Sequence, residues 1–302
     1  MIELLSNNLP LLAGFVFIVG LLFGSFFNVV IHRLPKMLQR EWQATATEIL
    51  KEADCTISCP GTKQDEKYNL VTPRSACPKC GHKITALENI PVISWLFLRG
   101  KCRSCKTPIS FRYPFVELLT ATTFATCAYY FGFSWLLVFA IIFTSFLIVG
   151  SFIDYDHKIL PDQLTLPLVW LGLSTYLFIK PEALQLSFAP SLESAVIGAL
   201  CGYLVLWSIY WLFKLITGKE GMGHGDFKLL AAIGAFVGVK MLPLVIILST
   251  VTGAVLGIIS MIVTKKGRDH TIPFGPFLAI AGWITLIWGE PLSQLYMSWL
   301  QP

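Results

Sequence analysis

Charged residues are scarce in this chain: Asp, Glu, Lys and Arg make up only 14% of its 302 residues, whereas hydrophobic residues make up 55%. Soluble domains carry about 25% charged residues on average. Several apolar runs also reach the roughly 20 residues that a helix needs to cross a bilayer. The composition excludes an ordinary soluble catalytic domain and predicts an all-α, polytopic membrane protein.

Basic residues are missing before the first apolar run. Glu3 precedes this run, and Arg33, Lys36 and Arg40 follow it, which reverses the order found in a secretory signal peptide. We therefore expect an uncleaved first span whose N-terminus lies outside. The net charge of +5 is small for a chain of this length, so a nucleic-acid partner is not expected.

Hydrophobicity predicts about eight transmembrane helices. Their approximate ranges are 9–31, 114–131, 135–153, 164–179, 195–215, 226–239, 244–263 and 272–289. With both ends outside, 21 of the 23 Lys and Arg residues lie on the cytoplasmic side, and only Lys180 and Lys240 lie outside, as the positive-inside rule requires. The predicted organisation is a first transmembrane helix (1–31), a polar cytoplasmic domain (32–113) and a transmembrane domain (114–302).

Small residues line one side of the first predicted span. Gly20 and Gly24 are spaced as in a small-xxx-small motif, with Ser25 beside them, which favours close approach of a second helix. Asn28 lies one turn further on, and an amide in hydrocarbon requires a hydrogen-bond partner. We expect this face to pack against another helix.

Two Cys-x-x-Cys pairs occur in the polar domain. Cys77 and Cys80 form the first pair, Cys102 and Cys105 form the second, and 21 residues separate them. This spacing is typical of a tetrahedral zinc site in which each pair supplies two thiolates from a tight turn. Four thiolates leave no open coordination position, so we expect a structural Zn²⁺ that stabilises a small cytoplasmic domain.

Other states of the cysteines are open. Disulfides are the alternative to zinc, although a reducing cytoplasm disfavours them. Cys55 and Cys59 form a further pair with the spacing Cys-x-x-x-Cys. They could bind a second metal ion or remain free thiols, and we assign them no role.

An acid follows a glycine-rich stretch at the start of the sixth predicted span. Gly221, Gly223 and Gly225 precede Asp226. Glycines permit unusual torsions and close approach of another backbone. An acid at the mouth of an apolar helix is costly, by about 2.5 to 3.5 kcal/mol at mid-bilayer, and marks a functional site by default. The alternative is a simple turn in which Asp226 caps the following helix.

A partner acid lies at the end of the third predicted span. Asp154, Asp156 and Asp162 occur within nine residues there, on the same predicted side of the membrane as Asp226. Two carboxylates held close together share a proton, so one can act as a general base and the other as a general acid. The structural alternative is that Asp154 and Asp162 cap the next helix and pair with Lys158, while Asp226 pairs with Lys228.

These residues together resemble a known family. Gly223-His224-Gly225-Asp226 fits the GxGD pattern of intramembrane aspartyl proteases. The chain resembles the type IV prepilin peptidases along nearly its whole length. The resemblance also rests on Ile153-Asp154 before Ile159-Leu160-Pro161-Asp162, the doubled Cys-x-x-Cys and the downstream Pro273-Phe274-Gly275-Pro276. In this resemblance Asp154 and Asp226 match the two catalytic aspartates, and Asp156 and Asp162 are supporting acids. Cys77, Cys80, Cys102 and Cys105 match the metal-binding cysteines.

The resemblance implies two activities in the bacterial inner membrane, with the active site facing the cytoplasm. The first is removal of a short basic leader from type IV prepilins and type II secretion pseudopilins. The second is N-methylation of the newly exposed residue, usually Phe, with S-adenosylmethionine. Prepilin and pseudopilin precursors and membrane lipid are thus the expected partners. The sequence itself contains no Gly-x-Gly-x-x-Gly nucleotide loop, so the individual residues that bind the methyl donor are not predicted. Because the donor is cytosolic, the cytoplasmic domain, and above all Arg99-Gly100-Lys101 beside Cys102, is the place where we expect it to bind.

Two other functions are compatible with the same residues. A transporter could use the same acids to bind protons or metal ions, but the acids lie at one face and no internal repeat is evident. A non-catalytic assembly factor of a pilus or secretion machine could use the cysteine domain to dock a partner.

Overall fold

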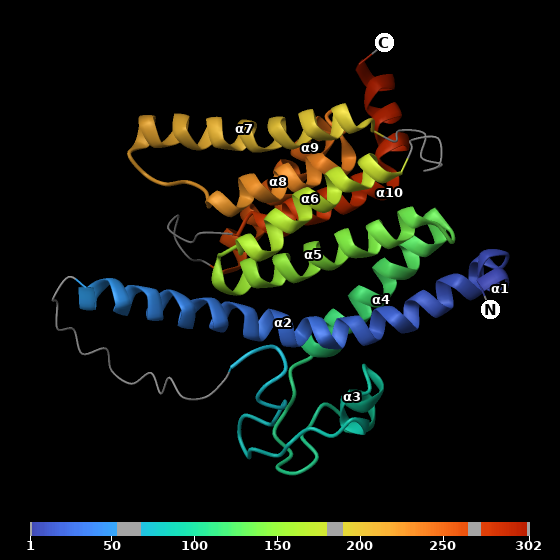
Figure 1. The fold of residues 1–302 in the computed structure, drawn as a ribbon, viewed down its shortest axis with the longest axis vertical. Coiled ribbons are helices and arrows are strands. Elements are labelled where there is room, and N and C mark those ends of the chain that lie inside the picture. The colour runs from blue at the N-terminus through green and yellow to red at the C-terminus, as the bar shows by residue number, and fades with distance from the viewer. Residues whose placement is uncertain (1, 53–67, 180–189, 265–272, 301–302) are drawn as a thin grey trace. The chain divides into compact units, whose positions relative to one another are not determined.

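The structure is a computed structural model that describes residues 2–52, 68–179, 190–264 and 273–300. These residues form ten α-helices and one short 3-10 helix, η1 (Leu87–Asn89), and they contain no β-strand (Figure 1). The α-helices are α1 (Ile2–Ser6), α2 (Leu9–Glu52), α3 (Ile93–Phe97), α4 (Arg112–Phe131), α5 (Trp135–His157), α6 (Asp162–Phe178), α7 (Leu192–Thr217), α8 (His224–Val237), α9 (Leu242–Thr264) and α10 (Gly275–Leu300). The predicted all-α fold is confirmed.

Four of the described helices are long and apolar enough to cross a membrane. They are α2, α5, α7 and the stretch Leu242–Ile259 of α9. This agrees with a membrane protein, while the total of eight spans stays a prediction. Lys180, which the topology prediction places outside, lies beyond the described residues.

The chain divides into two compact units, residues 15–123 and residues 1–14 together with 124–302. In the first unit, α2 runs against the first part of α4. A Cβ atom added at Gly20 would lie 2.6 Å from Cα of Ala121, and one added at Gly24 would lie 2.6 Å from Cα of Glu117. Asn28 Nδ2 donates to the carbonyl oxygen of Tyr113 at 3.1 Å. The predicted close helix packing is confirmed.

Helix α2 does not end where its apolar residues end. It continues as one helix of 44 residues to Glu52, across the predicted boundary at residue 31. Residues 32–52 contain no Gly and are rich in strong helix formers such as Glu, Gln, Lys and Leu, so nothing after Pro35 stops the helix. Arg33 ties it to the following loop by donating to the carbonyl oxygens of Asn69 at 2.9 Å and Pro73 at 2.6 Å.

Helix α8 forms the core of the second unit, and residues 229–237 are all buried. Helices α6, α7 and α10 pack against it (Figure 1). Glycines bring the α7 backbone close to the α8 backbone. A Cβ at Gly202 would lie 2.6 Å from the carbonyl oxygen of Leu230, and a Cβ at Gly198 would overlap the carbonyl oxygen of Gly234. With 14 residues, α8 is about 21 Å long, shorter than a bilayer core. Its position in the unit is therefore fixed by neighbouring helices rather than by its own length.

Candidate functional site

Asp226 lies in the first turn of α8. Gly223 occupies the N-cap position of this helix and Asp226 is its third residue, so the alternative in which Asp226 caps the helix is wrong. Its side chain is 7% exposed, and Oδ1 has no hydrogen-bond partner among the described residues. Lys228 does not pair with it either, because Lys228 Nζ lies 2.6 Å from Oδ1 of Asp162. The Asp226 carboxyl group is thus buried, with one oxygen unpaired among the described residues.

Asp154 lies in the last turns of α5 and is 6% exposed. Its Oδ2 accepts a hydrogen bond from the backbone N–H of Gly275, at the start of α10, at 2.9 Å. Lys158 ends α5 in a left-handed conformation and donates its backbone N–H to the Asp154 carbonyl oxygen. Pro161, not Asp154, is the N-cap of α6, so the proposed structural role of Asp154 as a cap of that helix is wrong.

The structure brings Asp154 and Asp226 into one neighbourhood. The two carboxyl groups are close enough to interact electrostatically. Leu160 lies between their helices: a Cβ added at Gly225 would lie 2.5 Å from its Cβ, and one added at Gly275 would lie 3.1 Å from its Cδ1. Because both positions are glycines, α8 and α10 can pack closely against Leu160. The arrangement thus brings two buried acids from distant segments within electrostatic reach of each other.

The remaining acids near these helix ends differ from this pair. Asp156 is exposed, and Asp162 forms an ion pair with Lys228 on the surface. Glu220 pairs with Lys214 at 2.9 Å, and the hydrogen bond from that ammonium group lowers the pKa of Glu220. None of the three is buried, which sets Asp154 and Asp226 apart on physical grounds.

Sequence reasoning missed two residues of this site, Gly275 and Leu160. The segment Pro273-Phe274-Gly275-Pro276 was recognised as a family feature and as a break before a helix, but its contact with Asp154 spans 121 positions in the chain. No local pattern encodes such a contact. Leu160 lies in Ile159-Leu160-Pro161-Asp162, which also belongs to the resemblance, but no local pattern indicates its contacts with Gly225 and Gly275.

The four predicted cysteines come together in the first unit. The sulfur atoms of Cys77, Cys80, Cys102 and Cys105 all lie within 4.8 Å of one another. Cys77 Sγ and Cys105 Sγ are 3.7 Å apart. Zinc–sulfur bonds of about 2.3 Å in a tetrahedron place sulfur atoms about 3.8 Å apart, so the donor set fits Zn²⁺. None of the six cysteines in the described ranges forms a disulfide, while Cys55 and Cys59 fall outside those ranges.

Each cysteine pair sits in a turn of the same design. Cys77 N–H donates to the His82 carbonyl and Gly81 N–H donates to the Cys77 carbonyl, both at 2.9 Å. In the second turn, Cys102 N–H donates to the Thr107 carbonyl and Lys106 N–H donates to the Cys102 carbonyl. Gly81 and Lys106 occupy equivalent positions with φ of 72° and 58°. The two halves of the cluster are thus built alike, although only the first has the glycine that this conformation favours.

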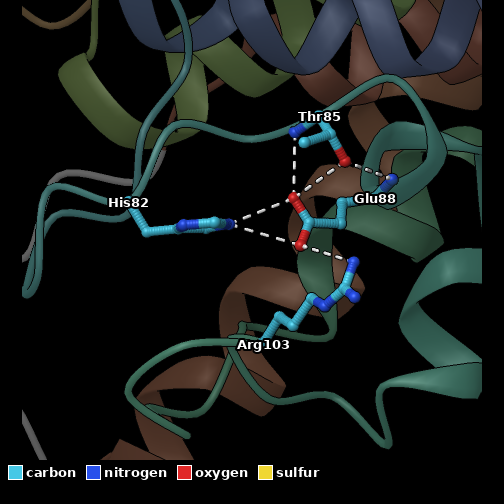
Figure 2. A network of polar contacts seen from close by, with 4 residues as sticks. All are labelled: His82, Thr85, Glu88 and Arg103. Carbon is cyan, nitrogen blue, oxygen red and sulfur yellow. Dashed lines mark hydrogen bonds and ion pairs between the residues drawn. The ribbon is translucent and has the colours of Figure 1, made fainter.

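Glu88 connects the two cysteine turns (Figure 2). Its carboxylate accepts hydrogen bonds from Thr85, at 2.9 Å from N and 3.0 Å from Oγ1, and lies 3.2 Å from Nε2 of His82 in the first turn. Arg103 of the second turn lies 3.7 Å away on the other carboxylate oxygen. The bond from the Thr85 backbone, with smaller contributions from His82, lowers the pKa of Glu88 to about 2. Sequence reasoning assigned Glu88 no role.

The fold and these two sites define a class: an all-helical membrane protein with a buried pair of aspartates and a separate four-cysteine cluster. Comparison with known proteins then places it more narrowly. Residues 18–131 match the bacterial peptidase A24 N-terminal domain, and residues 141–258 match the type IV leader peptidase family. The chain belongs to the type IV leader peptidase family.

Relatives match over nearly the full chain. Prepilin leader peptidase/N-methyltransferase from Aeromonas salmonicida is 52% identical over 295 residues, covering 97% of each chain. The protein of that name from Stutzerimonas stutzeri is 50% identical over 98% of each chain, and the one from Pseudomonas aeruginosa is 51% identical over 93% of this chain and 92% of the relative. No solved structure matches the chain significantly. The family predicted from the motifs is confirmed, and it favours an enzyme over a transporter or an assembly factor.

Proposed function

We propose that this protein is a membrane-embedded aspartic endopeptidase that removes the leader from type IV prepilins and type II secretion pseudopilins, and then N-methylates the new N-terminus. The name shared by relatives about 50% identical over nearly the whole chain carries both activities. The observation that carries the peptidase is the buried pair Asp154 and Asp226, held beside each other by α5 and α8.

In the proposed cleavage, one of the two aspartates, Asp154 and Asp226, acts on the attacking water and the other acts on the scissile carbonyl group. One carboxylate takes a proton from a water molecule that attacks the scissile carbonyl carbon, and the other carboxyl group donates a proton to the carbonyl oxygen. The tetrahedral intermediate then collapses as the C–N bond breaks. The leaving amine takes the proton that the first carboxylate removed from water, and one hydroxyl of the intermediate returns a proton to the second carboxylate, which restores the pair. The N–H of Gly275 holds the Asp154 carboxylate in place during these transfers.

The proposed topology has eight spans with both ends outside, so that the aspartates lie at the cytoplasmic face of the bacterial inner membrane. The positive-inside rule supports this orientation. A prepilin has a basic leader before an apolar helix, so the same rule keeps its leader on the cytoplasmic side. Its scissile bond then lies at the depth of the aspartates.

We further propose that Cys77, Cys80, Cys102 and Cys105 bind one structural Zn²⁺. The sulfur spacing supports this ion, and four thiolates leave no position for a water or a substrate. The ion would join the two cysteine turns and so stabilise the proposed domain of residues 32–113.

The methyl donor of the second activity is S-adenosylmethionine. Its sulfonium supplies a methyl group to the new α-amine, which must first lose a proton to become a nucleophile. The name of the relatives supports this activity, and no residue of this chain is assigned to bind the donor.

Mass spectrometry of a prepilin incubated with the protein in membranes and S-adenosylmethionine tests both reactions. Wild type should remove the leader and add one methyl group, whereas Asp154→Asn and Asp226→Asn should leave the precursor intact. Glu193→Gln, an exposed carboxylate at the start of α7, is the matched control and should retain cleavage. Cleavage that survives in either Asn variant but is lost in Asp156→Asn or Asp162→Asn would move the catalytic role to those acids. If wild type does not cleave the prepilin, the peptidase proposal is wrong, and a transporter or an assembly factor becomes the better explanation.

A further inference from the structure

Helix α3, between the two cysteine pairs, exposes an apolar surface. Ile93, Leu96 and Phe97 are 49%, 61% and 85% exposed, and they form one apolar patch. Trp95, on the other side of this short helix, contacts the rest of the domain. Its Nε1 donates to the Ile109 carbonyl at 3.2 Å, and its ring packs edge-on against Phe111. The helix is thus held in a fixed orientation with three large hydrophobic side chains facing outward.

The depth of α3 relative to the membrane follows from its attachment to α4. Glu117, only 8% exposed, accepts the backbone N–H of Val92 at 2.7 Å, immediately before α3 begins. Glu117 itself lies against Gly24 of α2. The start of α3 is therefore tied to the level of Gly24, not to the polar part of α2 that begins at His32.

The rise per residue of an α-helix gives the depth of Gly24 below the end of the apolar run of α2. Gly24 precedes Ile31, the last residue of the apolar run, by seven residues, which corresponds to about 10 Å along the helix. The Glu117 side chain points toward the start of α4 and reaches at most about one helical turn, or about 5 Å, in that direction. This reach is shorter than the distance of about 10 Å to the end of the apolar run, so Val92 lies at the level of apolar residues of α2. Figure 1 agrees, since α3 is drawn beneath the middle of α2 and far from its C-terminal end.

The surroundings of α3 match a lipid surface. Trp95, Phe111 and Phe115 form a continuous row of ring contacts, at 5.8 and 6.4 Å, from α3 to the exposed apolar face of α4. Arg99 and Lys101 follow α3 directly and are exposed. Apolar side chains flanked by aromatic rings and basic residues are the composition of segments that lie in the headgroup region.

We propose that Ile93, Leu96 and Phe97 insert into the cytoplasmic leaflet and anchor the cysteine domain to the bilayer, with Arg99 and Lys101 contacting anionic headgroups. The metal cluster is then held at the membrane surface rather than on a free cytoplasmic loop. This inference rests on α2 crossing the bilayer and is independent of the proposed catalytic activity.

Photo-crosslinking in vesicles tests the insertion directly. The full-length variant Phe97→p-benzoylphenylalanine, which keeps an aromatic side chain, is reconstituted into vesicles of phosphatidylcholine and phosphatidylglycerol without prepilin and illuminated. Val71→p-benzoylphenylalanine is the matched control, because Val71 is similarly exposed, at 79%, but lies in the loop held by Arg33 beyond the apolar run. We expect lipid adducts on the peptide that contains residue 97 in several-fold excess over those at residue 71.

Two further arms decide between lipid and other occupants. Replacing Arg99 and Lys101 by Gln should lower the adduct yield in vesicles that contain phosphatidylglycerol and leave it unchanged in pure phosphatidylcholine. Equal lipid labelling at positions 97 and 71 would overturn the proposal. So would crosslinks from position 97 to a second copy of the chain, or to added prepilin, in place of lipid. Retained zinc in each variant shows that the domain is folded.

Discussion

The backbone N–H of Gly275 lies 2.9 Å from Oδ2 of Asp154, although the two residues are 121 positions apart. This bond ties the start of α10 to the end of α5, beside the turn that begins α8. A Cβ atom at position 275 would lie 2.6 Å from the same carboxylate oxygen. The glycine therefore gives Asp154 both a hydrogen-bond donor and the space to accept it.

Substitution of Gly275 should impair cleavage without removing either aspartate. In Gly275→Ala the methyl group would push the Asp154 carboxylate away, and we expect kcat/KM for prepilin cleavage to fall by tenfold or more, equivalent to about 1.4 kcal/mol of transition-state stabilisation. Gly14→Ala is the control, because a Cβ at Gly14 would meet no atom within 4 Å. Equal rates for the two variants would show that the Gly275 contact does not position Asp154.

Loss of the Glu88 carboxylate should weaken metal retention. Glu88→Gln removes the charge that bridges His82 and Arg103, so we expect zinc transfer to a chromogenic chelator to accelerate by up to about tenfold, as for other partners that orient metal-binding groups. Because folding lowers the pKa of Glu88 from 4.5 to about 2, its contribution is fully present above about pH 4.5 and is lost as the pH falls toward 2. A comparison with wild type at pH 7 therefore measures the whole contribution.

The control for this measurement is Glu41→Gln, the same substitution at an exposed position of α2. It should release zinc at the wild-type rate. If Glu88→Gln behaves like this control, the network in Figure 2 has no part in holding the cysteine turns together.

Removal of the cysteine thiols should abolish zinc binding. Elemental analysis of the purified protein should find one zinc per chain in wild type and none in a variant with Cys77, Cys80, Cys102 and Cys105 replaced by Ser. Metal binding and folding are coupled in small zinc modules, so limited proteolysis should also cut this variant faster between residues 68 and 111. A variant with Cys127 and Cys201 replaced by Ser keeps the cluster and should retain zinc. A four-serine protein that binds as much zinc as wild type would contradict the site.

Close packing between α7 and α8 should make one glycine intolerant of a methyl group. In Gly198→Ala the new Cβ would overlap the carbonyl oxygen of Gly234, so the helices must separate, and we expect the free energy of unfolding to fall by about 1 to 3 kcal/mol. Leu200→Ala lies on the same helix with the leucine 58% exposed and should lower Tm far less. Matching thermal shifts for the two variants would show that the helices adjust without cost.

Much of the helical layout could be predicted because bilayer-length apolar runs are a local property of the chain. The packing of α2 against a second helix could likewise be predicted, from the small residues Gly20 and Gly24 and from the amide of Asn28. The continuation of α2 to Glu52 was not predicted, since the hydropathy that marks the end of a span says nothing about the end of a helix. The continuation is indicated instead by the composition of residues 32–52, which lack Gly and are rich in helix-favouring residues.

The candidate site was predicted only as far as its residue types stand out. An acid in an apolar context and a repeated Cys-x-x-Cys are costly or rare, so Asp226, the acidic cluster around Asp154 and the four cysteines stand out in the sequence. The choice of Asp154 over Asp156 and Asp162 rested on the resemblance to the family. The bonds from Gly275 to Asp154 and from Glu88 to His82 could not, because they depend on which distant segments fold together. Their catalytic and metal-binding roles stay predictions that the variants above will test.

The uninterrupted helix α2 has a mechanical consequence. Its 44 residues span about 66 Å, so roughly half of the rod lies beyond the apolar run. A change in bilayer thickness alters the tilt of a spanning helix, and a tilt of about 10° around Arg33 would move Glu52 by about 5 Å. The loop that Arg33 holds at Asn69 and Pro73 sits at the pivot and would scarcely move. Membrane thickness would then displace the distal end of α2 while leaving the loop next to the cysteine cluster in place.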